Sequence, residues 1–487
     1  MFSTKHYIDL AGGKFNGTST SDLRSLFREL ENSPTKDHIV VHFHGGLVSR
    51  ELAEAGAERL MTCYTEGGAY PIFFFWRSDL LTILSRDLDK IATEPIFRRL
   101  VKRLVQLALS KLKDYVGARS AGPLMLVSEE DLPDDPELLE QFATAREPDG
   151  AIAEGVELTS KQIEQAELEL ETDEIIQKES IAIAEWVAPA VEHPDLADRA
   201  GSYRVEPRPT LMSQNVRDEL AQAETARGAR GVSMFLLVKH GLIILKRVIE
   251  RFARARDHGI YATVVEEILR ELYLDSVGTS VWTLMKNDTH QAFGEDAEVF
   301  GGTAFGAELR KWWRPGRRIT LVGHSTGAIY IGNLLEHIDP LFDPEMKFDV
   351  IFLAPACSFE FLAARLEVFR RRVHHIRVFG LQDELERGYW EVPVLYPASL
   401  LYMVSGLFEE PTVDMPIVGM QRYFSNARPY TSQEIRAVVT YLDRKCVWSL
   451  ADGGPGFRCS AKNHGGFDAD QSTRASLTEF LRTAETG

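Results

Sequence analysis

The sequence contains little cysteine and no long hydrophobic run. Its 487 residues include four cysteines, whose scattered spacing matches neither a metal site nor a disulfide framework: Cys63, Cys357, Cys446 and Cys459. This scarcity excludes a small disulfide-rich domain and predicts a reduced, cytoplasmic setting. The most apolar stretch, 232–249, is interrupted by lysine, histidine and arginine, which argues against a transmembrane helix. The N-terminus lacks a basic segment followed by an apolar one, so we expect no secretory signal.

Basic residues are outnumbered by acidic ones, but the imbalance is local. The chain has 55 Lys and Arg against 72 Asp and Glu, a formal net charge of −17. The segment Glu129–Val187 alone contains 19 acidic and three basic residues and so carries nearly all of this charge. We therefore expect no nucleic-acid partner near that segment, whereas the rest of the chain is close to neutral.

Apolar runs and helical patterns alternate at both ends of the chain. The runs 38–43 and 69–76 predict buried strands, and a helical pattern at 51–64 separates them. Such a strand–helix–strand unit implies parallel pairing with a right-handed crossover. Further strands are predicted at 319–322, 348–354, 375–381 and 446–450. The fold class predicted is therefore α/β, with a doubly wound, mostly parallel sheet.

The sheet pattern is interrupted by a long helical and acidic segment. We divide the chain into an N-terminal part of the core (1–86), an insertion that acts as a cap or lid (87–259), and a C-terminal part of the core (260–487). Within the insertion, 232–256 is an amphipathic helix with a basic C-terminal end. Two interpretations stay open for this helix. It packs within its own domain, or it serves as a lid or as a helix that makes peripheral contact with a membrane surface.

The segment around Ser325 has the pattern of a nucleophile elbow. A short buried strand runs into Gly323-His324-Ser325-Thr326-Gly327, and an apolar helical pattern follows at once. In this arrangement a tight turn presents the serine hydroxyl above the edge of the sheet. Glycines at 323 and 327 suit the turn, because a Cβ there would collide where strand and helix crowd together. The alternative is a serine in an ordinary glycine-rich turn.

A nucleophilic serine needs a general base and a carboxylate that orients it. His464 lies in the loop between the last predicted strand and the closing helix, and Asp383 follows the second strand after the elbow. The neighbouring Glu384 is an alternative acid. An early strand also runs into His44-Gly45-Gly46-Leu47, whose backbone N–H groups suit an oxyanion hole.

These motifs together resemble the α/β-hydrolase superfamily, over roughly residues 1–86 and 260–487. The resemblance implies a Ser325–Asp383–His464 triad and an oxyanion hole formed by Gly46 or Leu47 with Thr326. The loop reads H-G-G-L here rather than H-G-G-G, which leaves open whether Gly46 or Leu47 donates. No narrower family is matched.

The function predicted is that of a serine hydrolase that cleaves a carboxylic ester, small or lipid-like, through an acyl-enzyme. Two alternatives stay open: an amidase or peptidase with the same triad, and an inactive hydrolase scaffold that binds a partner through its insertion. No cofactor and no metal are expected, since no His/Cys/Asp cluster suggests one.

Overall fold

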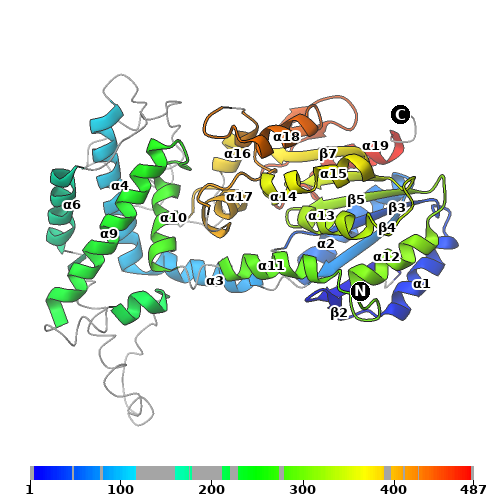
Figure 1. Cartoon of the computed structure of the whole chain (residues 1–487), viewed down its shortest axis with the longest axis horizontal. Helices are drawn as coiled ribbons and strands as arrows, with labels where there is room; N and C mark the ends of the chain where they lie inside the picture. Colours follow the sequence, from blue (N-terminus) through cyan, green and yellow to red (C-terminus); the bar gives the residue numbers. More distant parts are fainter. Residues whose placement is uncertain are drawn as a thin grey trace, which may run out of the picture.

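The computed structural model places an α/β part beside a helical lobe along the longest axis of the molecule (Figure 1). It describes residues 5–46, 49–76, 80–116, 159–174, 176–177, 211–219, 229–273, 279–388, 396–409, 412–425 and 427–483. Most of the acidic segment 129–187 lies outside these ranges. Its described part includes helix α6 (Ser160–Thr172), which begins with a capping box formed by Thr159 and Gln162.

The α/β part is built on one eight-stranded sheet with the order β2-β1-β4-β3-β5-β6-β7-β8. All neighbouring strands are parallel except β1 and β2. The strands are β1 (Tyr7–Ala11), β2 (Lys14–Phe15), β3 (His38–Phe43), β4 (Tyr70–Trp76), β5 (Arg318–His324), β6 (Phe348–Leu353), β7 (Val373–Leu381) and β8 (Cys446–Ser449). The predicted α/β class with a mostly parallel sheet is confirmed.

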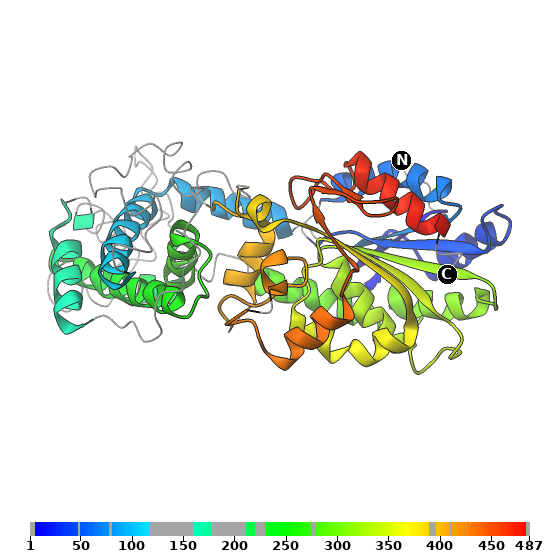
Figure 2. The same ribbon diagram turned by 90° about the horizontal axis from the view of Figure 1, so that it is seen from above.

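Helices cover both faces of this sheet (Figure 2). On one face α2 (Arg50–Glu66) packs against α19 (Gln471–Thr483), and on the other α13 (Gly327–Ile338) packs against α15 (Leu366–Arg372). Strands buried on both sides are mostly apolar, and every residue of β3 and β4 is buried. The two histidines of β3 are hydrogen-bonded, His38 to Thr320 and His42 to Tyr64.

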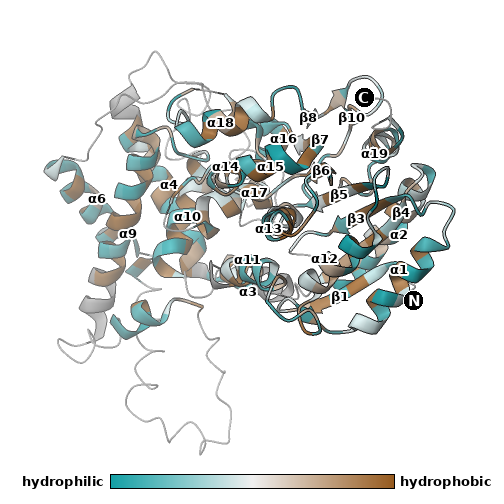
Figure 3. Ribbon diagram, turned by 45° about the vertical axis from the view of Figure 1, so that its right-hand side comes forward, coloured by the Kyte–Doolittle hydropathy of each residue, from teal (hydrophilic) through white to brown (hydrophobic). Residues whose placement is uncertain are grey.

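The other helices have amphipathic or short apolar patterns, and the alternation of hydrophobic and hydrophilic turns is visible along α1 and α18 in Figure 3. They are α1 (Thr20–Glu31), α11 (Thr279–Gln291), α12 (Gly301–Trp312), α14 (Phe359–Ala364), α16 (Asp383–Arg387), α17 (Leu400–Met403), the π-helix η4 (Val404–Phe408), the 3₁₀-helix η5 (Gln421–Phe424) and α18 (Gln433–Tyr441). A small hairpin pairs β9 (Ala451–Asp452) with β10 (Arg458–Cys459). Within the described ranges, every helix is too short or too polar to traverse a lipid bilayer.

The helical lobe contains α4 (Pro95–Val116), α9 (Ala229–Ala253) and α10 (Ile260–Leu272), and α3 (Leu80–Thr93) leads into it (Figure 1). Helix α10 packs against both α4 and α9, so the predicted boundary at 259/260 falls inside this packing unit. Leu237 and Ile244 of α9 are 2% and 0% exposed, and α9 also packs against α6. The apolar face of this helix is therefore covered by its own lobe.

The strand order reverses beside β3. From β3 the chain crosses through α2 to β4 on one side, whereas β5 lies on the other side and begins the run β5-β6-β7-β8. In open α/β sheets, ligands bind outside the carboxyl ends of the strands at such a switch point. The loops that follow β3 and β5 are therefore the first place to look for a functional site.

Candidate active site

Ser325 occupies a strained turn between β5 and α13. Its φ is +54°, in the left-handed region that residues other than glycine rarely adopt. The neighbouring strand β6 and the loop after it hold this turn: the Ser325 N–H donates to the carbonyl of Leu353 (2.8 Å), and the Ser325 carbonyl accepts from the N–H of Ala356 (3.1 Å). Strain of this kind persists only where the surroundings enforce it, and it is concentrated at functional sites.

The two glycines of the elbow are required by close packing, as the sequence analysis expected. A Cβ on Gly327 would collide with the carbonyl oxygen of Phe43 at the end of β3. A Cβ on Gly323 would lie 2.7 Å from the carbonyl group of Gly327. The turn thus brings the start of α13 directly against the carboxyl end of β3.

The His44-Gly45-Gly46 loop meets this turn. The N–H of Gly46 donates to the Thr326 hydroxyl, and a Cβ on Gly46 would lie 2.8 Å from the sulfur of Met285. Of the predicted oxyanion donors, Gly46 and Thr326 are therefore in contact, while Leu47 lies outside the described residues. The N–H of Thr326 stands at the start of α13, where backbone donors point out of the helix and favour negative charge.

His44 supports this loop and is not a free base. Its Nε2 accepts from the N–H of Trp76 (3.1 Å), so its Nδ1 carries the proton that is donated to the Gly45 carbonyl (2.7 Å). Its ring also stacks on the Trp76 ring. Burial, partly offset by the Gly45 hydrogen bond, lowers the pKa of His44 to about 4, so the ring is neutral at physiological pH.

His464 lies beside the elbow, but it is not hydrogen-bonded to Ser325. Its carbonyl accepts from Nε2 of His324 (2.9 Å), and the two rings lie 5.4 Å apart. His464 is buried, and its Nδ1 has no hydrogen-bond partner within the part of the chain that the structure describes. Burial, reinforced by His324, lowers the pKa of His464 to about 3. A neutral imidazole with an unpaired buried nitrogen therefore lies against His324, the residue before the candidate nucleophile.

Asp383 follows β7 and begins α16, at the same edge of the sheet as Ser325. Its Oδ1 accepts from the Tyr402 hydroxyl (2.6 Å), and no described hydrogen bond joins it to His464. Since β6 lies between β5 and β7, the ends of these two strands are about 10 Å apart. The alternative acid, Glu384, is exposed. The structure thus places serine, acid and histidine at one edge without connecting them.

A large buried group of charged and tyrosine side chains, which the sequence analysis missed, lies between the helical lobe and the α/β part. We call it the junction cluster: Arg251, His258, Glu266 and Glu267 from the lobe, with Tyr396, Asp414, Arg422, Tyr423 and Tyr430 from the stretch after α16. At its centre, His258 is hydrogen-bonded to Glu266 through Nδ1 (2.8 Å) and to Asp414 through Nε2 (3.0 Å).

The junction cluster reaches the predicted acid. Arg422 donates to the Tyr402 hydroxyl (3.3 Å), which in turn donates to Asp383. Burial alone would raise the pKa of Glu266, but His258 and Arg251 outweigh that effect and lower it below its usual range. Glu266 is therefore a buried carboxylate anion, stabilised by Arg251 and His258 of the same lobe.

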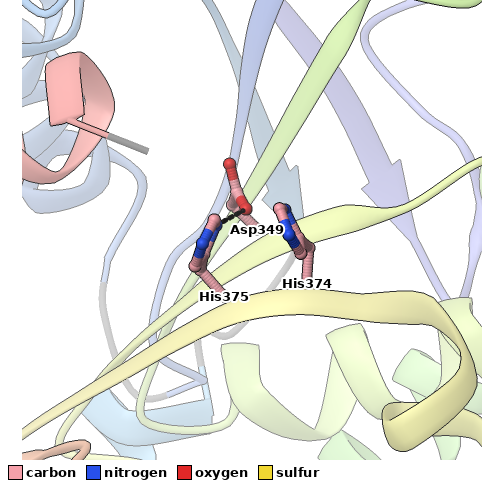
Figure 4. A group of neighbouring side chains, drawn as sticks. All are labelled: Asp349, His374 and His375. Carbon is pink, nitrogen blue, oxygen red and sulfur yellow. Dashed lines mark hydrogen bonds and ion pairs between the residues drawn. The ribbon is translucent and has the colours of Figure 1, made fainter. Parts of the chain in front are cut away.

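One group of potential metal ligands occurs among the described residues, at the opposite edge of the sheet: Asp349, His374 and His375 (Figure 4).

Comparisons with protein-family models, with curated proteins and with solved structures found no match. Fold and site together define the chain as an α/β protein with a strained serine at the switch point of its sheet.

Proposed function

We propose that the chain is a serine hydrolase of the α/β-hydrolase type that cleaves a carboxylic ester, small or lipid-like. The observation that carries the proposal is the positive φ of Ser325, in a strand–turn–helix at the switch point of the sheet. Such a turn has a conformational cost on the order of 1–3 kcal/mol. In the elbow of serine hydrolases, the strained turn exposes the nucleophilic hydroxyl above the sheet.

The proposed chemistry is acyl transfer in two steps. Ser325 Oγ attacks the ester carbonyl carbon and passes its proton to His464, while the N–H of Thr326 and that of Gly46 or Leu47 stabilise the oxyanion. For Gly46 to serve, its N–H must first release the Thr326 hydroxyl to which it donates. His464 then protonates the departing alcohol, and water, deprotonated by the same ring, releases the acid. Since His464 and Ser325 are not hydrogen-bonded, the proposal requires the loop around His464 to shift when substrate binds.

A fluorophosphonate probe tests the nucleophile, because it labels a serine only when that serine is activated. We expect labelling of the wild-type chain, none of Ser325→Ala, and unchanged labelling of the matched control Ser425→Ala, whose serine is exposed. Labelling that persists in Ser325→Ala would refute the assignment.

The acid is tested by a matched pair of isosteric variants. Asp383→Asn should reduce turnover of nitrophenyl esters by several orders of magnitude, since a triad carboxylate fixes the tautomer of the base. Glu384→Gln should leave turnover near that of the wild type. The reverse result would move the acid by one residue.

A second candidate is an inactive hydrolase scaffold that binds a partner through the insertion. It is favoured by the missing hydrogen bonds between His464 and the other two residues. An unlabelled wild-type chain would support it.

Amide cleavage by the same residues is separated from ester cleavage by comparing nitrophenyl esters with nitroanilides. Peripheral membrane contact through the insertion stays a prediction, and the buried face of α9 is not open to it.

A further inference from the structure

A second group of side chains with metal-ligating atoms lies where the strands begin, at the end of the sheet opposite Ser325. Asp349 lies on β6, and His374 and His375 are adjacent on β7 (Figure 4). Their potential ligand atoms all lie within 4.8 Å of one another. Neither the predicted triad nor the junction cluster uses them.

A β-bulge brings the two histidines together. Phe348 pairs with Val373 and Asp349 with His375, so His374 is an extra residue without a partner on β6. In a regular strand, adjacent side chains point to opposite faces, whereas a bulge re-aims one of them. The two imidazole rings consequently lie with their centroids 3.9 Å apart, beside the Asp349 carboxylate (Figure 4).

The Asp349 carboxylate is already oriented. Its Oδ2 accepts from Arg318 Nη2 (3.0 Å), which leaves Oδ1 facing Nδ1 of His375 at 3.0 Å. Ligating carboxylates commonly have such a supporting donor. The group is also accessible, because His374 is exposed and lines with Asp349 a cavity of about 510 Å³.

We propose that Asp349, His374 and His375 bind a divalent transition-metal ion, with Zn²⁺ as the first candidate. Two imidazoles and one carboxylate suit Zn²⁺ and its neighbours, whereas Mg²⁺ and Ca²⁺ prefer oxygen ligands alone. Tetrahedral coordination at about 2.1 Å sets neighbouring ligand atoms roughly 3.4 Å apart. The 3.0 Å pair has to open slightly, whereas a pair near the 4.8 Å limit has to close by about 1.4 Å. The metal replaces the proton that now joins His375 to Asp349.

A tetrahedral ion with three protein ligands keeps a fourth position for water or a ligand, and the cavity beside Asp349 and His374 gives access to it. Arg318 lines the same cavity. Its positive charge weakens attraction for the metal, so we expect a replaceable ion rather than a permanent one. Because this edge of the sheet is opposite to Ser325, the proposal is independent of hydrolase activity.

Calorimetric titration of the full chain with Zn²⁺ tests the site. We expect one ion per wild-type chain and at least a tenfold weaker association for His374→Ala and His375→Ala. His374 is exposed, so its variant should fold normally and remain interpretable. The matched control is His290→Ala, which removes an exposed histidine from α11 and should bind as the wild type does.

A thermal melt gives an independent readout. Bound Zn²⁺ should raise the melting temperature of the wild type and of His290→Ala but not that of His374→Ala. Absence of saturable binding to the wild type, or equal binding by all variants, would overturn the proposal.

Discussion

The substitution Arg251→Met probes the junction cluster most directly. The Arg251 side chain is 6% exposed, and its Nη1 donates to Glu266 (2.6 Å) and Glu267 (3.0 Å), whose side chains are 0% and 1% exposed. Methionine fills most of the volume but leaves two buried carboxylates short of a cation. Removing one partner of a buried ion pair destabilises a protein by about 3–5 kcal/mol.

The lower end of that range applies here, because both glutamates keep another partner. Glu266 still accepts from His258 (2.8 Å), and Glu267 still pairs with Arg270. We therefore expect a loss of about 3 kcal/mol in the free energy of unfolding.

Urea unfolding followed by circular dichroism measures this loss. The matched control is Lys246→Met on the same helix, whose lysine is 68% exposed and 4.0 Å from Glu250. Exposed pairs contribute little, so the control should lose less than about 1 kcal/mol. If Arg251→Met lost no more than the control, the buried ion pairs of Arg251 with Glu266 and Glu267 would not stabilise the fold.

Three further predictions follow from the elbow and the buried histidines. Gly327→Ala should destabilise the protein by at least about 2 kcal/mol in urea unfolding, because its Cβ meets a backbone oxygen; Gly454→Ala, with open space around it, should not. His464→Ala should abolish ester turnover as completely as Ser325→Ala, because members of a triad act as a unit; substantial residual turnover would exclude His464 as the base. The pKa of His44 in the folded state, about 4, lies below its unfolded value of about 6.5. Between these two pKa values, the unfolded chain binds a proton at His44 that the folded chain does not bind. The free energy of unfolding therefore falls as the pH drops through this window. At pH 5 the loss attributable to this histidine is about 2 kcal/mol relative to pH 8, and urea midpoints that do not change with pH would contradict it.

Much of the core fold was readable from local patterns. The strand predicted at 38–43 coincides with β3, and the one at 69–76 differs from β4 by one residue. The long helical segment predicted to interrupt the sheet begins with two helices in the structure, α3 and α4. The break falls at Pro95, which favours the first turn of a new helix and disfavours helical backbone in the residue before it.

The sequence predicted the candidate site only where the residues of the site are adjacent in the chain. The elbow around Ser325 needs only neighbouring residues, and its strand–turn–helix form is confirmed. His258 and Asp414 are 156 residues apart, so no local pattern could pair them. The adjacency of His374 and His375 was visible, but regular alternation would send them to opposite faces. Only the register shift on β7 brings them together.

The central strand pair has a consequence for synthesis on the ribosome. β3 pairs with β5 across a separation in sequence of about 280 residues, as the contact between His38 and Thr320 shows. At about 5–20 residues per second, the apolar edge of β3 waits roughly 15–60 s for its neighbour to emerge. We expect nascent chains that stop before β5 to depend on chaperones and to aggregate without them, whereas chains that extend past α13 should not. Equal solubility of the two sets of ribosome-released fragments would show that the edge is protected in another way.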